Sequence, residues 1–476
     1  MAVVTRIAIV GGGPAGYEAA QVAAELGADV TVIESDGVGG ACVLYDCVPS
    51  KTLIATSEKV TAFRDAPTLG VCAQAASDVS VQLSVVNHRV LALAANQSAD
   101  IRTRLLRQGV TVVLGRARFT EAQPGRTFAL EVIEHESEES GPPATRQVEA
   151  DVVLIATGGT PRVLPGAEPD GERILSWRQV YDLDELPSHL IVVGSGVTGA
   201  EFASAYSEMG APVTLVSSRE KVLPGEDPDA ADVIEKVFTA RGGALMKQAR
   251  AQKVERTGDG VEVQLTDGRT VSGSHVLMCV GSVPNTADLG LENVGLDLTD
   301  SGFISVDRVS RTRVPGIYAA GDCTGVLLLA SVAAMQGRVA MWHALGQAVQ
   351  PLRLKTVAAN VFTHPEIATV GIGHAAVTSG AVPARTVLLP LAGNARAKMQ
   401  GVAEGFVKMY CRPATGVVIG GSVVAPQASE LIQPIAMAVQ LGLTVNELAA
   451  TFTVYPSISG SVTEAARQLM HSDDLD

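Results

Sequence analysis

The chain has 476 residues, of which 47% are hydrophobic and 18% charged, and its formal net charge is −14 at pH 7. This length exceeds one ordinary hydrophobic core, so we expect about three domains. The negative charge argues against nucleic acids and anionic membrane surfaces as partners. Because the sequence contains no apolar run of roughly 18 residues or more, we expect no membrane-spanning helix.

The N-terminal segment TRIAIVGGGPAGYEAAQVAAELGADVTVIES predicts a strand, a tight turn, a helix and a second strand. Gly11, Gly13 and Gly16 form the pattern G-x-G-x-x-G after the first strand, and the second strand ends at Glu34. The first glycine permits the turn, the second lets the backbone approach a pyrophosphate, and the third allows close packing of helix and strand. The helix N-terminus favours phosphate, and Glu34 can accept hydrogen bonds from ribose hydroxyls. The segment therefore predicts a dinucleotide site.

A second segment, SHLIVVGSGVTGAEFASAYSEMGAPVTLVSS, repeats the pattern with Gly194, Gly196 and Gly199. Two such folds in one chain predict two cofactors. FAD in the first fold and a nicotinamide nucleotide in the second would provide a path for hydride.

The residue at the end of the second strand bears on the choice of nicotinamide nucleotide. Ser217 stands where the first segment has an acidic residue, and Arg219 and Lys221 follow it. A carboxylate in that place would repel a 2′-phosphate, so its absence favours NADPH and still allows NADH. Alternatively, Arg219 is only a solvated loop charge.

Two other strands end at residues that we expect beside the first cofactor. The apolar run 150–162 contains Thr157 and Gly158, and we interpret it as the crossover back from the FAD fold. The run 316–325 places Asp322 at a turn before a helix-like stretch. Asp322 suits a hydrogen bond from a ribityl hydroxyl. The alternative is that Asp322 caps the following helix, and one residue can serve in both ways.

The stretch GGACVLYDCVPSK contains two cysteines, Cys42 and Cys47, five positions apart. Together with GGGPAG, ATGGTPR, GSGVTGAE, GSVPN, YAAGDCTG and VFTHPEIATVG, it makes the chain resemble the flavoprotein disulfide reductase family. This is the lipoamide dehydrogenase-like class I of the pyridine nucleotide-disulfide oxidoreductases. The motifs occur in the family's order and cover essentially the whole chain.

The resemblance implies an α/β protein with two Rossmann-like dinucleotide-binding domains, one for FAD and one for NAD(P), and a C-terminal α+β dimerisation domain. It also implies a homodimer. We expect the FAD domain over residues 1–155 and 280–350, the NAD(P) domain over 156–279 and the dimerisation domain over 351–476. Since the chain enters its first strand without a charged leader, we expect a cytoplasmic location.

In the family the two cysteines lie on a helix against the flavin. Cys47 corresponds to the sulfur nearest the ring, which forms the charge-transfer thiolate, and Cys42 to the thiol that attacks a disulfide. Two residues depart from the family pattern: Ala41 replaces a threonine, and Asp46 replaces a glycine. A carboxylate beside a thiol raises the pKa of the thiol and disfavours the thiolate. Two interpretations therefore stay open: the cysteine pair is redox-active, or it is retained without taking part in catalysis. The remaining cysteines lack metal-ligand spacing, and we expect no metal and four buried structural thiols: Cys72, Cys279, Cys323 and Cys411.

Lys51 closes the cysteine motif, and in the family this lysine lies near flavin N5 and pairs with a glutamate, here Glu201. The alternative is an ordinary surface ion pair. Val197 stands where some relatives place a tyrosine over the flavin, and its smaller side chain would leave the nicotinamide pocket open. Further cofactor contacts are expected at the following residues: Pro14, Ala15, Gly40, Ala41, Ala117, Ala156 and Ala330 for FAD, and Ser218 and Gly281, besides Val197 and Glu201, for NAD(P).

The C-terminus departs from the relatives that reduce disulfides. Those relatives carry H-P-T-x-x-E, in which the histidine is the acid/base for the attacking thiol and the glutamate orients it. Here the matching stretch begins VYPSISG, with Tyr455 at the histidine position and Gly460 at the glutamate position. Tyrosine, with a reference pKa of about 10, is a poor base at neutral pH. We expect His364, in FTHPEI, to have a structural role instead.

The sequence thus predicts an FAD-dependent enzyme that passes hydride from NADPH or NADH to flavin and then electrons to quinones or similar acceptors. The chain resembles the NAD(P)H:quinone reductase branch of the family, which lacks the His-Glu pair. The first alternative is a disulfide reductase that uses Cys42 and Cys47 on lipoamide or another small disulfide. The second is a flavin-bound redox sensor without turnover.

Overall fold

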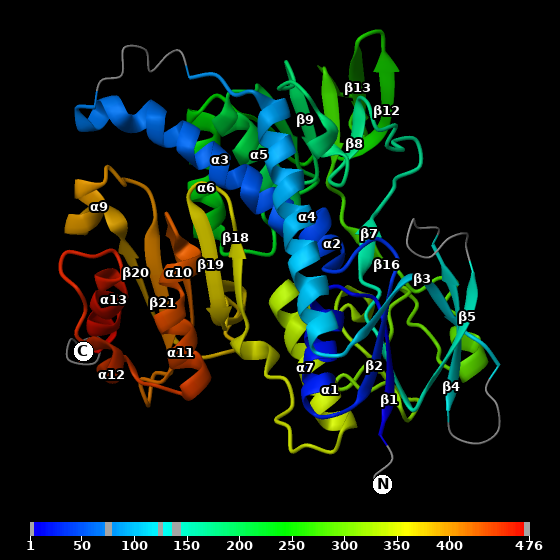
Figure 1. Ribbon diagram of the computed structural model, residues 1–476. Coiled ribbons are helices and arrows are strands. Elements are labelled where there is room, and N and C mark those ends of the chain that lie inside the picture. Colours follow the sequence, from blue (N-terminus) through cyan, green and yellow to red (C-terminus); the bar gives the residue numbers. More distant parts are fainter. Residues whose placement is uncertain (1–3, 72–78, 122–126, 136–143, 471–476) are drawn as a thin grey trace. The chain divides into compact units, whose positions relative to one another are not determined.

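The computed structural model describes residues 4–71, 79–121, 127–135 and 144–470 (Figure 1). The polar stretch 134–147 is typical of a surface loop between strands, with no chemical role. Most of this stretch, and Cys72, lie outside the described part of the chain. The chain forms two compact units. Their segments are Met1–Ser50, His88–Arg162 and Ser282–Arg353 for the first unit, and Lys51–Asn87, Val163–Gly281 and Leu354–Asp476 for the second.

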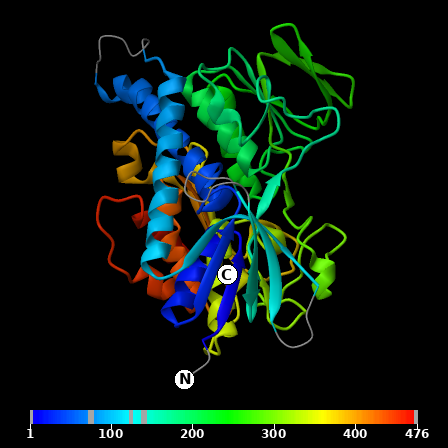
Figure 2. The same ribbon diagram turned by 45° about the vertical axis from the view of Figure 1, so that its right-hand side comes forward.

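The first unit is built on a seven-stranded sheet with the order β17-β6-β1-β2-β3-β4-β5. Its strands are β1 (Arg6–Val10), β2 (Asp29–Glu34), β3 (Thr111–Phe119), β4 (Phe128–Glu134), β5 (Thr145–Ala150), β6 (Val152–Ile155) and β17 (Ile317–Ala319). The first five strands in the spatial order pair in parallel, while β4 and β5 add an antiparallel edge. The blue and cyan strands lie side by side in both views (Figure 1, Figure 2).

Helix α1 (Pro14–Glu25) connects β1 to β2 and begins with proline, which is pre-shaped for a helix start. It packs against α7 (Ala330–Ala344) so closely that a Cβ on Gly337 would lie 2.1 Å from the carbonyl oxygen of Ala15. Both helices join the buried core of the sheet together with part of α4 (Leu83–Arg107). A short ladder of β7 (Gly159–Pro161) and β16 (Ser282–Pro284) completes the unit.

The second unit contains a five-stranded parallel sheet with the order β11-β10-β9-β15-β8. The elements of this part are β8 (Ile174–Ser176), β9 (Leu190–Val193), α5 (Val197–Met209), β10 (Val213–Val216), α6 (Pro228–Ala240), β11 (Ala244–Met246) and β15 (His275–Met278). An antiparallel ladder lies beside them: β12 (Ala251–Thr257), β13 (Gly260–Leu265) and β14 (Thr270–Gly273). Residues 156–279 therefore contain a second strand–helix–strand unit of the expected kind.

The same unit contains a five-stranded antiparallel sheet with the order β18-β19-β22-β21-β20. Its elements are β18 (Ala358–Val361), β19 (Glu366–Gly371), α8 (His374–Thr378), β20 (Arg385–Pro390), α9 (Ala395–Met399), β21 (Phe406–Cys411), β22 (Val418–Ala425), α10 (Ala428–Leu431), α11 (Gln433–Leu441), α12 (Val445–Ala449) and α13 (Gly460–Met470). β21 is buried throughout, and residues of α10 to α13 share one core with it. The mixture of antiparallel strands and helices is the α+β arrangement predicted for the C-terminal part.

The cysteine stretch differs from the prediction of one helix. Cys42 lies on α2 (Gly40–Leu44), and Cys47 begins α3 (Cys47–Asp65). Tyr45 ends α2, so the two cysteines stand on separate helices joined through Asp46. The helix is interrupted at Tyr45 and Asp46, and Asp46 is one of the two residues that depart from the family pattern.

The expectation of buried structural thiols is confirmed for the three of these four cysteines that the structure describes: Cys279 is 8% exposed, and Cys323 and Cys411 are fully buried. Burial raises the pKa of Cys323 to about 11, which keeps it protonated and unreactive at neutral pH. Among the described residues, no helix has both the length and the apolar character that a membrane crossing needs.

Candidate functional site

The first glycine turn leaves space at one of its three glycines. A Cβ on Gly11 would lie 2.1 Å from the carbonyl oxygen of Ala156, and one on Gly16 would lie 1.8 Å from that of Gly11. At Gly13 the nearest atom is the carbonyl oxygen of Gly39, 3.9 Å away. The outer two glycines are thus required by packing, while the middle one leaves a cradle of the kind that a pyrophosphate fills.

Glu34 lies under this turn, at the end of β2. Its side chain is buried, with 6% exposed. One carboxylate oxygen accepts a hydrogen bond from the backbone N–H of Gly12 at 2.5 Å, and the other accepts from that of Asp36 at 2.8 Å. The carboxylate is therefore fixed beside the cradle, and its contact with a ribose hydroxyl stays a prediction.

Asp322 is the first residue of a short 3₁₀ turn and not the cap of α7, whose N-cap is Leu329. The capping alternative is therefore wrong for the long helix. Burial, and secondarily the charge of Asp46, raise the pKa of Asp322 to about 6. A poorly solvated carboxylate of this kind is stabilised by a hydroxyl donor, which fits the predicted ribityl contact.

Thr157 and Gly158 form part of a turn that Asn285 fixes from the neighbouring ladder. The Thr157 hydroxyl donates to the backbone carbonyl of Asn285 at 2.6 Å, and the Asn285 amide returns a bond to the carbonyl of Thr157 at 2.9 Å. Asn285 belongs to the GSVPN motif, so two motifs distant in sequence meet here.

The two cysteines are partly buried within their helices. The charge of Cys42 is, after burial, the largest influence that raises the pKa of Tyr17 on α1. Tyr17 is therefore a neighbour of Cys42 that the sequence did not indicate. Asp46 acts on Asp322 in the same way, so a carboxylate of the cysteine stretch contributes to the raised pKa of the predicted ribityl ligand.

The second glycine turn repeats the geometry of the first. A Cβ on Gly194 would lie 2.1 Å from the carbonyl oxygen of Cys279, and one on Gly199 would lie 1.8 Å from that of Gly194. A Cβ on Gly196 would meet no atom within 4 Å. This turn also fits a pyrophosphate at its middle glycine.

The predicted coenzyme-selecting residues differ in accessibility. Ser217 is 1% exposed, and its hydroxyl oxygen lies 2.7 Å from that of Ser195 in the glycine turn. Arg219 is exposed at the start of the following loop. Lys221 is held by Asp232 on α6, with Nζ–oxygen distances of 2.6 and 2.7 Å. Of the two basic residues, Arg219 is thus the one available to a 2′-phosphate.

Lys51 and Glu201 form an ion pair with an Nζ–Oε2 distance of 2.8 Å. Glu201 is 3% exposed, so this is not an ordinary surface pair. Its other oxygen accepts a hydrogen bond from the backbone N–H of Phe362 at 2.9 Å, and the Phe362 ring centroid lies 4.9 Å from the Lys51 Nζ. Phe362 therefore contacts both members of the pair; it lies in the VFTHPEIATVG motif, but the sequence assigned it no role.

At the C-terminus, Tyr455 is 86% exposed, and Gly460 begins α13. Phe452 and Val454, in the same loop, are also highly exposed. His364 is mostly buried, its backbone N–H donates to the hydroxyl of Ser204 at 3.2 Å, and burial lowers its pKa. These contacts fit the structural role expected for His364.

The other predicted contacts lie on elements that frame the two turns. Pro14 and Ala15 begin α1, Gly40 and Ala41 begin α2, Ala117 is buried on β3, Ala156 follows β6 and Ala330 begins α7; Val197, Ser218 and Gly281 are exposed near the second turn. Their contacts with the cofactors stay predictions.

These turns, helices and sheets define a flavin- and nicotinamide-dependent oxidoreductase fold. The chain belongs to the pyridine nucleotide-disulphide oxidoreductase family: the family model matches residues 5–337, and the model of its dimerisation domain matches residues 357–466. FAD and NAD(P)H are the cofactors of this family.

Among its relatives, an NAD(P)H dehydrogenase (quinone) of Mycobacterium tuberculosis is 60% identical over 99% of this chain and 95% of its own length. A dihydrolipoyl dehydrogenase of Chlorobaculum tepidum is 32% identical over 98% of this chain and 97% of its own length. The crystal structure of LpdA from M. tuberculosis superposes with a TM-score of 0.92 at 60% identity, covering 98% of this chain and 100% of that one. The flavoprotein disulfide reductase RclA of Escherichia coli, at 24% identity, shares the fold with a TM-score of 0.84 over 97% of this chain and 99% of that one.

Proposed function

We propose that this chain is an FAD-dependent oxidoreductase that takes hydride from NAD(P)H and delivers electrons to quinones. The sequence of the C-terminal stretch supports a quinone, rather than a disulfide, as the acceptor. It keeps the register of the disulfide-reducing relatives but presents Tyr455 and Gly460 where they have an acid/base histidine and its glutamate.

FAD, when bound, accepts a hydride from the nicotinamide and releases electrons to an acceptor. The chain's own residues bind and orient the reactants. Gly13 and Gly196 leave room for the two pyrophosphates, and Glu34 and Asp322 would accept hydrogen bonds from ribose and ribityl hydroxyls. Lys51, held by its buried carboxylate partner, supplies a positive charge where negative charge develops during reduction.

The missing acid/base group separates the two classes of acceptor. Reduction of a disulfide needs a proton for the leaving thiolate, and loss of a general acid/base costs on the order of 10² to 10⁴ in rate. A planar quinone can take a hydride from the reduced ring, and the quinol anion that results can take its second proton from solvent, so this reaction needs proximity and orientation but no positioned acid/base group. The name of the 60% identical relative, an NAD(P)H dehydrogenase (quinone), supports the same acceptor.

The test compares acceptors in one assay of NADPH oxidation by the FAD-loaded enzyme. We expect rapid turnover with menadione and slow turnover with lipoamide or other small oxidised thiols. Rapid lipoamide reduction with little menadione activity would reverse the assignment.

A disulfide reductase is the second candidate. Both cysteines are kept, and several dihydrolipoyl dehydrogenases are 31–33% identical to this chain. In that case Tyr455, or a group on the substrate, would have to handle the proton.

Replacement of Cys42 by serine tests whether electrons pass through the sulfurs. We expect Cys42→Ser to leave menadione reduction within a few-fold of the parent, because the proposed route to a quinone does not use the attacking thiol. Steady-state NADPH oxidation measures this, and residual lipoamide reduction by the same variant serves as the comparison. Loss of menadione activity would mean that electrons travel through the cysteine pair.

We propose NADPH as the preferred nucleotide, with NADH also accepted. The support is the exposed Arg219 beside a strand end that carries serine and no carboxylate. The ratio of kcat/KM for the two nucleotides measures the preference.

We also propose a homodimer. The dimerisation-domain match covers the loop with Phe452, Val454 and Tyr455, whose exposed fractions of 103%, 77% and 86% are unusual for large apolar and aromatic side chains unless a partner covers them. Light scattering should give the mass of two chains, and a mass of one chain at micromolar concentration would contradict this. The cytoplasmic location stays a prediction.

A further inference from the structure

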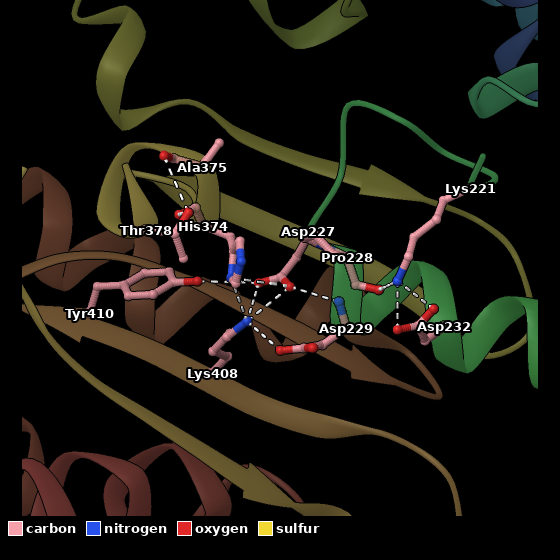
Figure 3. A network of polar contacts seen from close by, with 10 residues as sticks. All are labelled: Lys221, Asp227, Pro228, Asp229, Asp232, His374, Ala375, Thr378, Lys408 and Tyr410. Carbon is pink, nitrogen blue, oxygen red and sulfur yellow. Dashed lines mark hydrogen bonds and ion pairs between the residues drawn. The ribbon is translucent and has the colours of Figure 1, made fainter. Parts of the chain in front are cut away.

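A buried ionic cluster surrounds the ammonium of Lys408 in the second unit (Figure 3). Lys408, on β21, is 3% exposed, and its Nζ donates to both carboxylate oxygens of Asp227 at 2.9 and 2.8 Å and to one of Asp229 at 2.6 Å. Nδ1 of His374 lies 3.0 Å from the same nitrogen, and the hydroxyl of Tyr410 donates to Asp227 at 3.2 Å. Two carboxylates and an imidazole could ligate a metal ion, but here the lysine supplies the positive charge.

The cluster includes the residue that caps the start of α6. Asp227 is the N-cap of α6, and its side chain accepts a hydrogen bond from the backbone N–H of Asp229 at 3.0 Å. Asp227 is only 6% exposed, and a buried carboxylate needs a partner to remain charged. Lys408 therefore joins the capped end of α6 to the antiparallel sheet.

Helix α6 in turn holds the loop 217–226 that follows β10. Lys221 of the loop is paired with Asp232 at 2.6 Å, and the backbone N–H of Val222 donates to Glu235 at 2.9 Å. Both acceptors lie on α6. The loop is thus attached to the helix at Val222 and, more weakly, through the exposed Lys221–Asp232 pair, so a shift of the helix would carry this part of the loop with it.

The same loop contains the residues predicted to contact the adenosine end of the nicotinamide nucleotide. It begins at Ser217 and carries the exposed Arg219. The backbone N–H of Leu223 donates to the carbonyl oxygen of Ser195 at 2.8 Å, which ties the loop to the second glycine turn. The position of the loop therefore bears directly on the predicted nucleotide site.

We propose that Lys408 is a positioning residue for the nicotinamide nucleotide. By fixing the start of α6 against the antiparallel sheet, it sets the position of the loop 217–226 and hence the affinity for the nucleotide. Lys408 touches neither the nucleotide nor the flavin in this account. The inference rests on the proposed function only in that it takes the second glycine turn as a nicotinamide nucleotide site.

The test measures binding of NADP⁺ and NAD⁺ to the oxidised, FAD-loaded enzyme by titration calorimetry, so that no turnover is needed. We expect Lys408→Met to raise both dissociation constants about tenfold. KM for NADPH should rise in parallel while kcat at saturation stays within about twofold, because the reacting groups are unchanged.

Lys408→Met leaves the buried Asp227 without its partner and could fail to fold. The double variant Asp227→Asn/Lys408→Met removes both charges and keeps a side chain that caps helices well. We expect the double variant to show the same weakening of nucleotide binding with a stability closer to the parent.

The matched control is Lys236→Met. Lys236, also on α6, pairs with Glu404 at 2.6 Å, but both side chains are exposed, so the pair should contribute little. Nucleotide dissociation constants within twofold of the parent in the double variant would overturn the proposal. If the parent itself binds neither NADP⁺ nor NAD⁺, the proposed function fails instead.

Discussion

Gly196→Val is expected to lower kcat/KM for NADPH and NADH roughly a hundredfold, equivalent to about 2.7 kcal/mol of binding. No protein atom lies within 4 Å of the position where a Cβ would stand, so the added side chain does not disturb the turn itself. It fills the space that a nucleotide pyrophosphate needs. The FAD content and thermal stability of the variant should therefore match those of the parent.

Calorimetry with NADP⁺ and steady-state kinetics together measure this effect. Gly393→Val is the matched control, since Gly393 also has open space around its Cβ position but lies in the C-terminal sheet region. Equal nucleotide affinity in Gly196→Val and Gly393→Val would show that the second glycine turn does not receive the pyrophosphate.

Glu201→Ala should slow the reduction of bound FAD by NADPH by roughly a hundredfold, as removal of one preorganised electrostatic group does in other enzymes. The buried carboxylate holds the Lys51 ammonium at 2.8 Å and the Phe362 backbone at 2.9 Å. Without it, Lys51 loses its ion pair with Glu201 and one of the contacts that hold it beside the Phe362 ring. Glu201→Gln should fall between the parent and the alanine variant, because the amide keeps an acceptor for the Phe362 N–H but not the charge.

Anaerobic stopped-flow spectroscopy of the flavin band measures this rate directly. The control is Glu404→Ala, which removes a carboxylate from the exposed pair with Lys236 and should change nothing. If Glu201→Ala reduces its flavin as fast as the parent does, the Lys51–Glu201 pair takes no part in hydride transfer.

Much of the fold could be predicted because its signals are local. The glycine spacing, the apolar strand before it and the helix after it all fall within about thirty residues, so β1, α1 and β2 follow from the sequence, as do β9, α5 and β10. The Lys51–Glu201 pair was predictable only through the family resemblance, since its members are 150 positions apart.

Other features of the site depend on contacts that no local pattern encodes. Phe362, which directly follows β18, contacts Lys51, and the pKa of Asp322 is raised first by burial and then by the charge of Asp46. The break between the cysteine helices occurs within a stretch whose family pattern predicted one continuous helix. The Lys408 cluster joins residues about 180 positions apart, so only the folded chain shows why a lysine stands in a strand that is otherwise almost entirely apolar.

The most direct test of the account is the anaerobic reoxidation of enzyme that NADPH has reduced. The reduced enzyme is mixed with menadione, or with lipoamide, in a stopped-flow instrument, and the return of oxidised-flavin absorbance is followed. We predict that menadione restores it at least as fast as steady-state turnover, while lipoamide does so far more slowly. The opposite result would be rapid reoxidation of the flavin by lipoamide, with the flavin staying reduced in the presence of menadione. That result would contradict electron transfer from the flavin to a quinone.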